Sequence, residues 1–169
     1  RQRQMCIRDR DWASAAELNV NAVRNLSGAS EERQKVVYVD SDADGSMKLA
    51  ADGDINTFWH TVHNQFYLAP YPHEIQIALA KETTVKGLKY TPRQDSSEGR
   101  IGKYEVYISH DGKEWGKAVA SGIFADSKEV QTVEFNPCKA RYVKLQALSA
   151  VIKEAKMAAV AELEVLLVE

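Results

Sequence analysis

Two acidic, glycine-containing clusters lie close together between residues 40 and 60, and each could in principle hold a metal ion. The first reads D-x-D-x-D-G at 40–45, and the second reads D-G-D at 52–54. Calcium prefers carboxylate and carbonyl oxygens, and a glycine permits the sharp turn that wraps a loop around an ion. Trp59 and His60 follow at once. The stretch therefore combines the residue types of a metal site and of a ligand-binding site.

The first cluster matches only the opening half of an EF-hand loop. A loop that began at Asp40 would need a bidentate glutamate at its twelfth position, where this chain has Ala51. The preceding segment, 35–40, is β-branched and aromatic, which favours a strand over the flanking helix of an EF-hand. We therefore reject the EF-hand interpretation.

The second cluster is a better candidate for calcium. Asp52 and Asp54 supply carboxylates, and Thr57 supplies a hydroxyl within the same short loop. Calcium takes about six to eight oxygens, many of them from backbone carbonyls. On its own, however, the motif more often marks an Asp-Gly turn with solvated carboxylates.

Composition restricts the classes of function. The chain has 169 residues, which suits one ordinary domain, and a hydrophobic fraction of 44%, which is enough for a sizeable core. Its net charge is -2 and no basic stripe occurs, so nucleic acid is a poor candidate for a partner. No segment approaches the roughly 20 apolar residues of a membrane span. Cys6 and Cys138 provide neither a disulfide framework nor zinc-ligand spacing.

The ends of the chain suggest a piece of a tandem array. Residues 1–11 are charged and aperiodic, and we interpret them as a non-native leader. The segment WASAAELNV at 12–20 returns as MAAVAELEV at 157–165, with five of nine positions identical. Coincidence between two alanine-rich segments is the alternative to a repeat. We expect residues 12–20 to be the last strand of a preceding copy, 21–34 to be a linker, and 35–169 to be the module itself.

The central region favours strands over helices. Turn signals such as Asp111-Gly112 separate short segments that are β-branched, aromatic or alternately apolar and polar. Helix is scarce, and 46–53 could form one short turn. Many short strands at this spacing predict an all-β, antiparallel sandwich. The expected strands are 35–40, 74–79, 84–92, 103–109, 130–135, 141–148 and 161–169.

Several of these motifs, in this order, resemble the coagulation factor V/VIII type C (discoidin) domain. They are ADGDINTFWHT, YPHEIQIAL, VKGLKYTPRQDSSEGRIGKYEVYISHDGKEW and ARYVKLQAL followed by AELEV. More narrowly, the chain is similar to bacterial galactose-binding-like carbohydrate-binding modules of secreted glycan-degrading enzymes. The resemblance runs from about Lys35 to Val168. It implies a β-sandwich jelly roll that binds sugar with loops at one end and carries one structural calcium ion.

The resemblance also implies the partners of the chain and where it acts. Modules of this kind bind a glycan such as galactose, catalyse nothing themselves, and are covalently linked to a catalytic domain and neighbouring modules. A secreted or cell-surface location, extracellular or periplasmic, follows from that role. The same resemblance completes the calcium set, because the family holds its ion with the second loop and the start of the last strand. The matching positions are Ala161, through its carbonyl, and Glu162, through its side chain.

For the sugar site, the resemblance points to a histidine, an arginine and an acidic residue on adjacent loops. The matching residues are His60, Arg93 and Asp42. Charged groups of this kind hydrogen-bond sugar hydroxyls directionally, while an aromatic ring stacks on the pyranose. Arg100 is a weaker candidate, with bracing of its loop as the alternative role. We expect Trp59 to pack in the core or beneath a loop.

The chain departs from the family pattern at its aromatic platforms. Many sugar-binding relatives have a tryptophan shortly after the W-H-T motif, whereas this chain has His63 and then Phe66. The other platform commonly precedes the last strand, where this chain has Met157. Stacking would then come from His63, Phe66, Tyr67 or Tyr71. The pair His60 and His63 also has a metal-like spacing, but no third zinc ligand is evident in the sequence.

Three other functions are weighed against sugar binding. No hydrolase, metalloprotease or phosphate-loop motif is present, so no residue is singled out for catalysis. Lipid- or protein-binding discoidin domains usually join their termini by a disulfide, for which Cys138 has no credible partner. A structural spacer with a decayed sugar site is the third alternative, and Met157 favours it.

Overall fold

The structure, a computed structural model, describes residues 33–63 and 69–168. The expected leader, the expected strand of a preceding copy and nearly all of the expected linker lie outside these residues. Phe66 and Tyr67 lie outside them as well. The interpretations of all these segments stay predictions.

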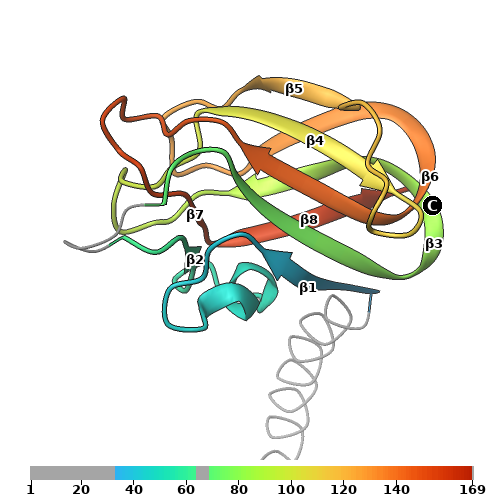
Figure 1. Ribbon diagram of the computed structural model, residues 1–169, viewed down its shortest axis with the longest axis horizontal. Coiled ribbons are helices and arrows are strands. Elements are labelled where there is room, and N and C mark those ends of the chain that lie inside the picture. The colour runs from blue at the N-terminus through green and yellow to red at the C-terminus, as the bar shows by residue number, and fades with distance from the viewer. Residues whose placement is uncertain (1–32, 64–68, 169) are drawn as a thin grey trace, which may run out of the picture.

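The described residues form an antiparallel β-fold with one short helix, which confirms the predicted all-β class (Figure 1). Buried and exposed residues alternate along the paired strands, as expected where one face of a sheet covers a core. The 3-10 helix η1 lies within the segment for which a short helical turn was predicted. The elements are β1 (Gln34–Val39), η1 (Ser46–Ala51), β2 (Trp59–His60), β3 (His73–Thr91), β4 (Lys103–Ser109), β5 (Ala120–Ile123), β6 (Gln131–Ala147), β7 (Ala159–Val160) and β8 (Glu162–Leu167).

Two strands are much longer than the sequence pattern predicts. The expected strands 74–79 and 84–92 are one strand, β3, and the expected strands 130–135 and 141–148 are one strand, β6. β3 and β6 pair along most of their length, with register shifts near Thr83 and Gly87. The first half of β3 also pairs with β1, and its second half also pairs with β8. β4 and β5 extend the β6 side, so the sheet order is β1-β3-β6-β4-β5 with β8 beside β3.

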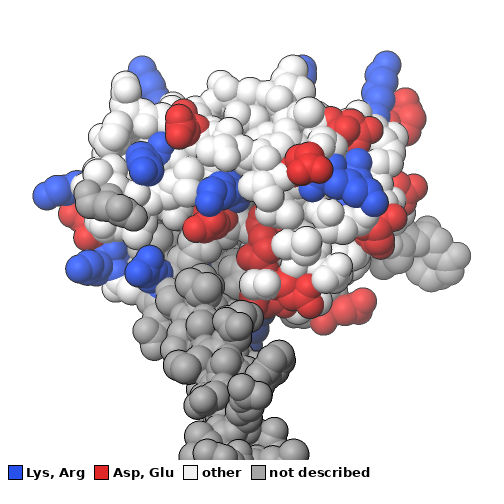
Figure 2. Space-filling model, turned by 180° about the vertical axis from the view of Figure 1, so that it is seen from behind, with Lys and Arg blue, Asp and Glu red and all other residues white. Residues whose placement is uncertain are grey.

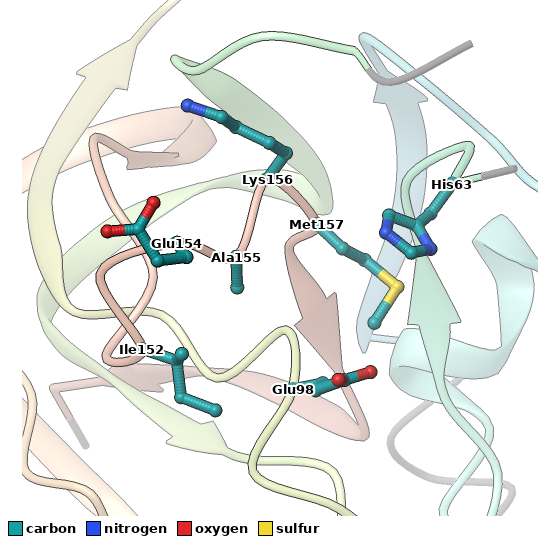
Figure 3. A pocket seen from close by; sticks show the side chains of 7 residues that line it. All are labelled: His63, Glu98, Ile152, Glu154, Ala155, Lys156 and Met157. Atoms are coloured by element: carbon teal, nitrogen blue, oxygen red, sulfur yellow. The ribbon is translucent and has the colours of Figure 1, made fainter. Parts of the chain in front are cut away.

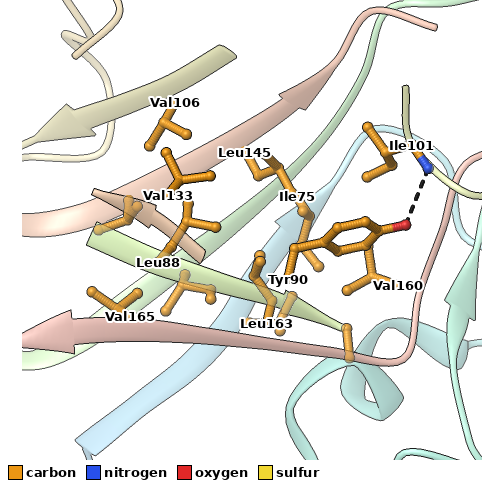
Figure 4. Close-up of a cluster of buried hydrophobic side chains, with 14 of the residues drawn as sticks. Ile75, Leu88, Tyr90, Ile101, Val106, Val133, Leu145, Val160, Leu163 and Val165 are labelled. Atoms are coloured by element: carbon orange, nitrogen blue, oxygen red, sulfur yellow. Dashed lines mark hydrogen bonds between the residues drawn. The ribbon is translucent and has the colours of Figure 1, made fainter. Parts of the chain in front are cut away.

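The core lies between the layers and is closed at one end by Tyr90 (Figure 4). The Tyr90 hydroxyl accepts a hydrogen bond from the Ile101 amide at 3.0 Å and donates to the Ala159 carbonyl at 3.2 Å. Burial raises the pKa of this hydroxyl, so it keeps its proton as a donor. Tyr90 therefore ties β3, the segment before β4, and β7 together at the end of the sandwich where the candidate site lies.

The surface carries charges of both signs. Lys and Arg side chains are interspersed with Asp and Glu on the face seen in Figure 2. Among the described residues, no helix is long and apolar enough to cross a membrane.

Candidate functional site

The two short strands β2 and β7 bring three loops together at the left end of the sandwich in Figure 1. His60 pairs with Ala159 across these strands. The Ala159 amide donates to the Gly99 carbonyl at 2.7 Å, which joins the loop 93–100 to β7. Neighbouring Thr61 exchanges hydrogen bonds with Ala158. Loops that are far apart in the sequence are thus fixed to one another by backbone hydrogen bonds.

Trp59 anchors this end of the fold and is not exposed to a ligand. Its side chain is in the core, with the residue only 1% exposed, and its indole nitrogen donates to the Ser41 carbonyl at 3.0 Å. The expectation that Trp59 packs in the core or under a loop is confirmed. Because side chains alternate along a strand, burying Trp59 turns the neighbouring His60 toward the loops.

Arg93 is held in one orientation by three groups. Its Nε and Nη2 donate to the two carboxylate oxygens of Asp95 at 2.8 and 2.7 Å, and its Nη1 lies 3.4 Å from the Glu98 carbonyl. The guanidinium carbon lies 4.2 Å from the centre of the Phe58 ring. A guanidinium carries five N–H donors, so two have no partner among the described residues and are available to a ligand. Arg93 is therefore oriented before any ligand arrives.

His60 adjoins this arginine through Phe58. The rings of Phe58 and His60 lie 5.7 Å apart, and His60 Nδ1 lies 3.1 Å from the Thr61 carbonyl. If Nδ1 carries the proton for that contact, Nε2 is left as an acceptor. The structure thus brings the predicted His60 and Arg93 to the same phenylalanine ring.

Asp42 is connected to the backbone of His60 through the Ser46 hydroxyl. Its carboxylate accepts a hydrogen bond from the Ser46 hydroxyl at 3.1 Å, and that hydroxyl in turn accepts the His60 amide at 3.3 Å. One carboxylate oxygen of Asp42 is therefore engaged within its own loop. Asp42 is half-buried, so the other oxygen is the group that could reach a ligand.

A small pocket of about 190 Å³ adjoins Arg93 at Glu98, whose carbonyl Arg93 contacts, but His60, Arg93 and Asp42 are not among the described residues that line it (Figure 3). Met157 extends between His63 and Glu98, although the methionine itself is only 6% exposed. Ile152 is among the exposed hydrophobic residues. The described residues that line this pocket include no aromatic ring other than the imidazole of His63. Among the described residues, the lining is His63, Glu98, Ile152, Glu154, Ala155, Lys156 and Met157.

Arg100 does not join this surface. Its side chain is buried, and its Nη1 donates to Asp126 at 2.7 Å. Its Nε has no hydrogen-bond partner among the described residues. This position favours the bracing role over ligand contact.

The second acidic cluster lies directly against the start of β8. The Gly53 amide donates to the Glu162 carboxylate at 2.7 Å, and the Thr57 hydroxyl donates to Asp52 at 2.8 Å. Asp54 instead accepts the amide and side chain of Asn56, which lowers its pKa. The structure therefore brings Asp52, Thr57 and Glu162 together, while the Asp54 carboxylate turns toward Asn56.

Ala161 and Glu162 lie at the junction of β7 and β8, and the Glu162 carboxylate reaches the Gly53 amide of the second cluster. Burial raises the pKa of Glu162 to about 7, and the neighbouring Asp52 carboxylate adds to the shift, whereas the Gly53 amide opposes it. Two carboxylates held together in this way favour a shared cation. The donor set therefore fits calcium.

Among the described residues, no group of three or more His, Cys, Asp or Glu side chains is placed to hold a metal ion. A calcium ion at the second cluster would take its remaining oxygens from backbone carbonyls, such as that of Ala161, and from water. For zinc, His60 and His63 find no third ligand among these residues.

Three residues around Arg93 and the pocket were not predicted from the sequence. Phe58, Asp95 and Glu98 hold Arg93 or line the pocket, yet none of them was a candidate. The sequence does contain a signal for Asp95, because a carboxylate two residues after an arginine in a glycine-containing loop can fold back onto it. Phe58 carries no such signal, because nothing in the sequence distinguishes an aromatic ring that packs on an arginine from one that packs in the core.

Comparison with known proteins identifies the family of the chain. The model of the F5/8 type C domain family matches residues 28–163. The chain belongs to this family. It is 40% identical over 139 residues to a sialidase of Micromonospora viridifaciens, a match that covers 80% of this chain and 21% of the relative. This F5/8 type C domain thus spans about a fifth of the length of that enzyme.

Solved structures of carbohydrate-binding modules resemble the domain as well. A module of Clostridium perfringens, CpGH89CBM32-5 in complex with GalNAc-β-1,3-galactose, superposes with a TM-score of 0.72 at 32% identity, covering 81% of this chain and 97% of the module. The family 32 module of NanJ from C. perfringens, in complex with galactose, superposes with a TM-score of 0.70 at 30% identity, covering 80% of this chain and 95% of that one. The fold is therefore the galactose-binding-like β-sandwich.

Proposed function

We propose that this F5/8 type C domain is a non-catalytic carbohydrate-binding module that binds galactose or a related glycan. The observation that carries the proposal is the orientation of Arg93 by Asp95 and Phe58 beside His60. Two free guanidinium N–H groups and an imidazole nitrogen offer directional hydrogen bonds to a pair of sugar hydroxyls. The similar modules of C. perfringens, one in complex with galactose and one with a galactose-containing disaccharide, support the same ligand class.

The module would act by raising local concentration. A weak sugar site on a covalently attached module keeps a catalytic domain near its glycan without any chemistry of its own. The relatives in which this domain is about a fifth of a longer enzyme support such an arrangement. The parent protein would then be a bacterial enzyme that acts on glycans outside the cell or at its surface, with further modules beside this one.

A structural calcium ion is the second part of the proposal. Asp52, Thr57 and Glu162, with the Ala161 carbonyl, would hold it and tie an early loop to the last strand. Such an ion would stabilise the fold rather than contact the sugar.

A glycan array followed by calorimetric titration with galactose tests the sugar site. Arg93→Ala and His60→Ala are expected to weaken binding by about tenfold to a hundredfold, the range for losing a hydrogen bond to a charged group. Arg141→Ala is the matched control, because that arginine caps the Ala80 carbonyl elsewhere on the sandwich. Equal binding by wild type and both site variants would overturn the assignment.

A spacer role is the second candidate, and one observation favours it. Met157 is almost completely buried and the described lining of the pocket offers no large aromatic ring. The array distinguishes the two functions, because a spacer would bind none of the galactose-containing glycans.

A further inference from the structure

His73 is a buried imidazole that joins two distant segments. It is 0% exposed, and its Nδ1 lies 2.8 Å from Asp40 Oδ2, just after β1. Its Nε2 lies 3.0 Å from the carbonyl of Lys156, in the loop 151–157. The other oxygen of Asp40 accepts the Glu74 amide at 2.7 Å, which fixes the carboxylate in place.

Both partners of the imidazole are acceptors. A carboxylate and a backbone carbonyl have no proton to give, so each ring nitrogen must donate for both hydrogen bonds to form. Only the imidazolium has two N–H groups. The neutral ring would place a lone pair against an oxygen at one of these two contacts. The geometry therefore describes a protonated His73 paired with Asp40.

Tyr71 holds the residue that follows Lys156 in the loop 151–157. Its hydroxyl donates to the Met157 carbonyl at 2.7 Å, and its ring lies 4.7 Å from that of His73. Two consecutive carbonyls, of Lys156 and Met157, are thus held by two neighbouring rings. Lys156 and Met157 both line the pocket of about 190 Å³ described above (Figure 3).

We propose that His73 is a positioning residue for the pocket: as an imidazolium between Asp40 and the Lys156 carbonyl it fixes the loop 151–157, and loss of its proton loosens that loop and weakens glycan binding. The statement about glycan binding rests on the proposed function. The statement about the loop does not, because it concerns hydrogen bonds within the chain alone.

The groups around His73 set the direction of the pH dependence. Burial by itself would lower the pKa of His73, but the hydrogen bond and charge of Asp40 and the carbonyl of Lys156 outweigh it, and the pKa is raised. Burial also raises the pKa of Tyr71, so its hydroxyl stays protonated while His73 titrates. The Lys156 side chain is exposed. The stabilisation of the loop is thus complete below the ordinary histidine pKa of about 6.5 and is lost as pH rises through the raised value.

The test measures amide hydrogen exchange of residues 151–158 against pH, corrected for the intrinsic pH dependence of exchange. The wild-type loop should be protected at pH 6 and lose about tenfold or more of its protection as His73 deprotonates, because one hydrogen bond to a charged group is lost. Nitrogen-15 NMR of the ring should find both nitrogens of His73 protonated at pH 6.

Asp40→Asn is the decisive variant. An asparagine amide can donate to Nδ1, so a neutral His73 could accept from Asn and still donate to the Lys156 carbonyl. The loop should then keep its protection across the pH range, and the pH dependence should disappear. A histidine with a merely structural role would show no such loss of pH dependence. His73→Phe should remove the protection of the loop at every pH.

His110→Asn is the matched control. His110 also pairs with a carboxylate, Glu82 at 2.7 Å, but on the exposed surface. Its replacement should leave the exchange of residues 151–158 unchanged. Unaltered pH dependence in Asp40→Asn, or a ring of His73 that is neutral at pH 6, would overturn the proposal.

Galactose titrations at the same pH values separate this inference from the function on which it partly rests. Wild-type affinity should fall over the same pH interval in which loop protection falls, and should not do so in Asp40→Asn. If the loop responds as described but no galactose binds at any pH, the proposed function fails and the role of His73 in the loop stands. If the affinity for galactose stays constant over the pH interval in which the protection of the loop falls, the positioning role is wrong.

Discussion

The two regions that flank β2 and β7 balance their charges in opposite ways. In the loop beside β8, Asp52 and Glu162 are two carboxylates close enough that burial and their mutual repulsion raise the pKa of Glu162 to about 7. In the neighbouring region, Arg93 and Asp95 form a bidentate pair of opposite charge. Among the described residues, no Lys or Arg forms a salt bridge with Asp52 or Glu162, so the first region suits a cation. The second is neutralised but keeps directional N–H donors, which suits an uncharged polar ligand such as a sugar.

Replacing Trp59 should damage both regions at once, because it lies between Thr57 and His60. Trp59→Ala is expected to lower the free energy of unfolding by about 3 to 5 kcal/mol, from the cavity it leaves in the core. It also leaves the Ser41 carbonyl without its indole donor. Chemical denaturation measures the loss. A change below about 1 kcal/mol would contradict the anchoring role.

Chelation of calcium should affect only the carboxylate region. At calcium concentrations about 100 times Kd, the bound ion stabilises the native state by about 2.7 kcal/mol, or about 5 to 10 °C in Tm for a domain of this size. Addition of EGTA should remove that increment in the wild type and should change nothing in Glu162→Gln. Glu164→Gln is the control, because its partner is the exposed Lys89. An unchanged Tm of the wild type on chelation would reject the calcium site.

Supplying an aromatic platform should strengthen the other region. His63→Trp places a large ring at the edge of the pocket, and a stacking gain of about 1 to 3 kcal/mol would tighten galactose binding by roughly tenfold or more. His110→Trp, on the exposed surface far from the pocket, should have no such effect. Calorimetric titration checks both. No gain in His63→Trp would mean that a sugar ring does not lie against this wall.

The smallest expected effect distinguishes the role of Arg93 in binding from the role of Arg100 in stability. Asp95→Asn should weaken galactose binding several-fold by releasing Arg93, yet leave stability within about 0.5 kcal/mol, because Asp95 is mostly exposed. Asp126→Asn should instead lower stability and leave galactose binding unchanged, since it removes the charged partner of the buried Arg100. Paired titration and denaturation experiments test the contrast. It fails if Asp95→Asn lowers stability and leaves affinity intact.

Alternation of apolar and polar residues was enough to predict the fold class and most strand positions. It failed where β3 and β6 pass from one layer to the other. Ala80, Lys81 and Glu82 are exposed there, and Pro137 has no amide to donate, so both segments have the polar, broken pattern of a turn. β3 nevertheless continues, because it pairs with β6 on both sides of the register shift between Ala78 and Thr83. Exposure at a crossing between layers cannot be distinguished from exposure at a turn by sequence pattern alone.

The candidate site was predicted in part. His60 and Arg93 do lie at the same phenylalanine ring, and Asp52 and Glu162 do meet across more than a hundred residues of chain. Asp40 was considered only as part of a failed EF-hand loop, whereas it pairs with His73, 33 residues further along. A pairing of that kind depends on the tertiary structure, because neither residue has a neighbour in the sequence that reveals its partner. The contact of Phe58 with Arg93, 35 residues further along, is hidden for the same reason.

The length of β3 and β6 has a consequence for how the domain folds and unfolds. β3 pairs with β1 at one end and with β8 at the other, while β6 pairs with β3 along both of its halves and with β4 at its second half. Neither layer can therefore separate while the other persists, and we expect a single all-or-none transition without a half-open intermediate. Most of these pairings join residues that are distant in the chain, so closing the sandwich is a search over long loops. Folding should accordingly take milliseconds to seconds, as in other β-sandwiches of high contact order.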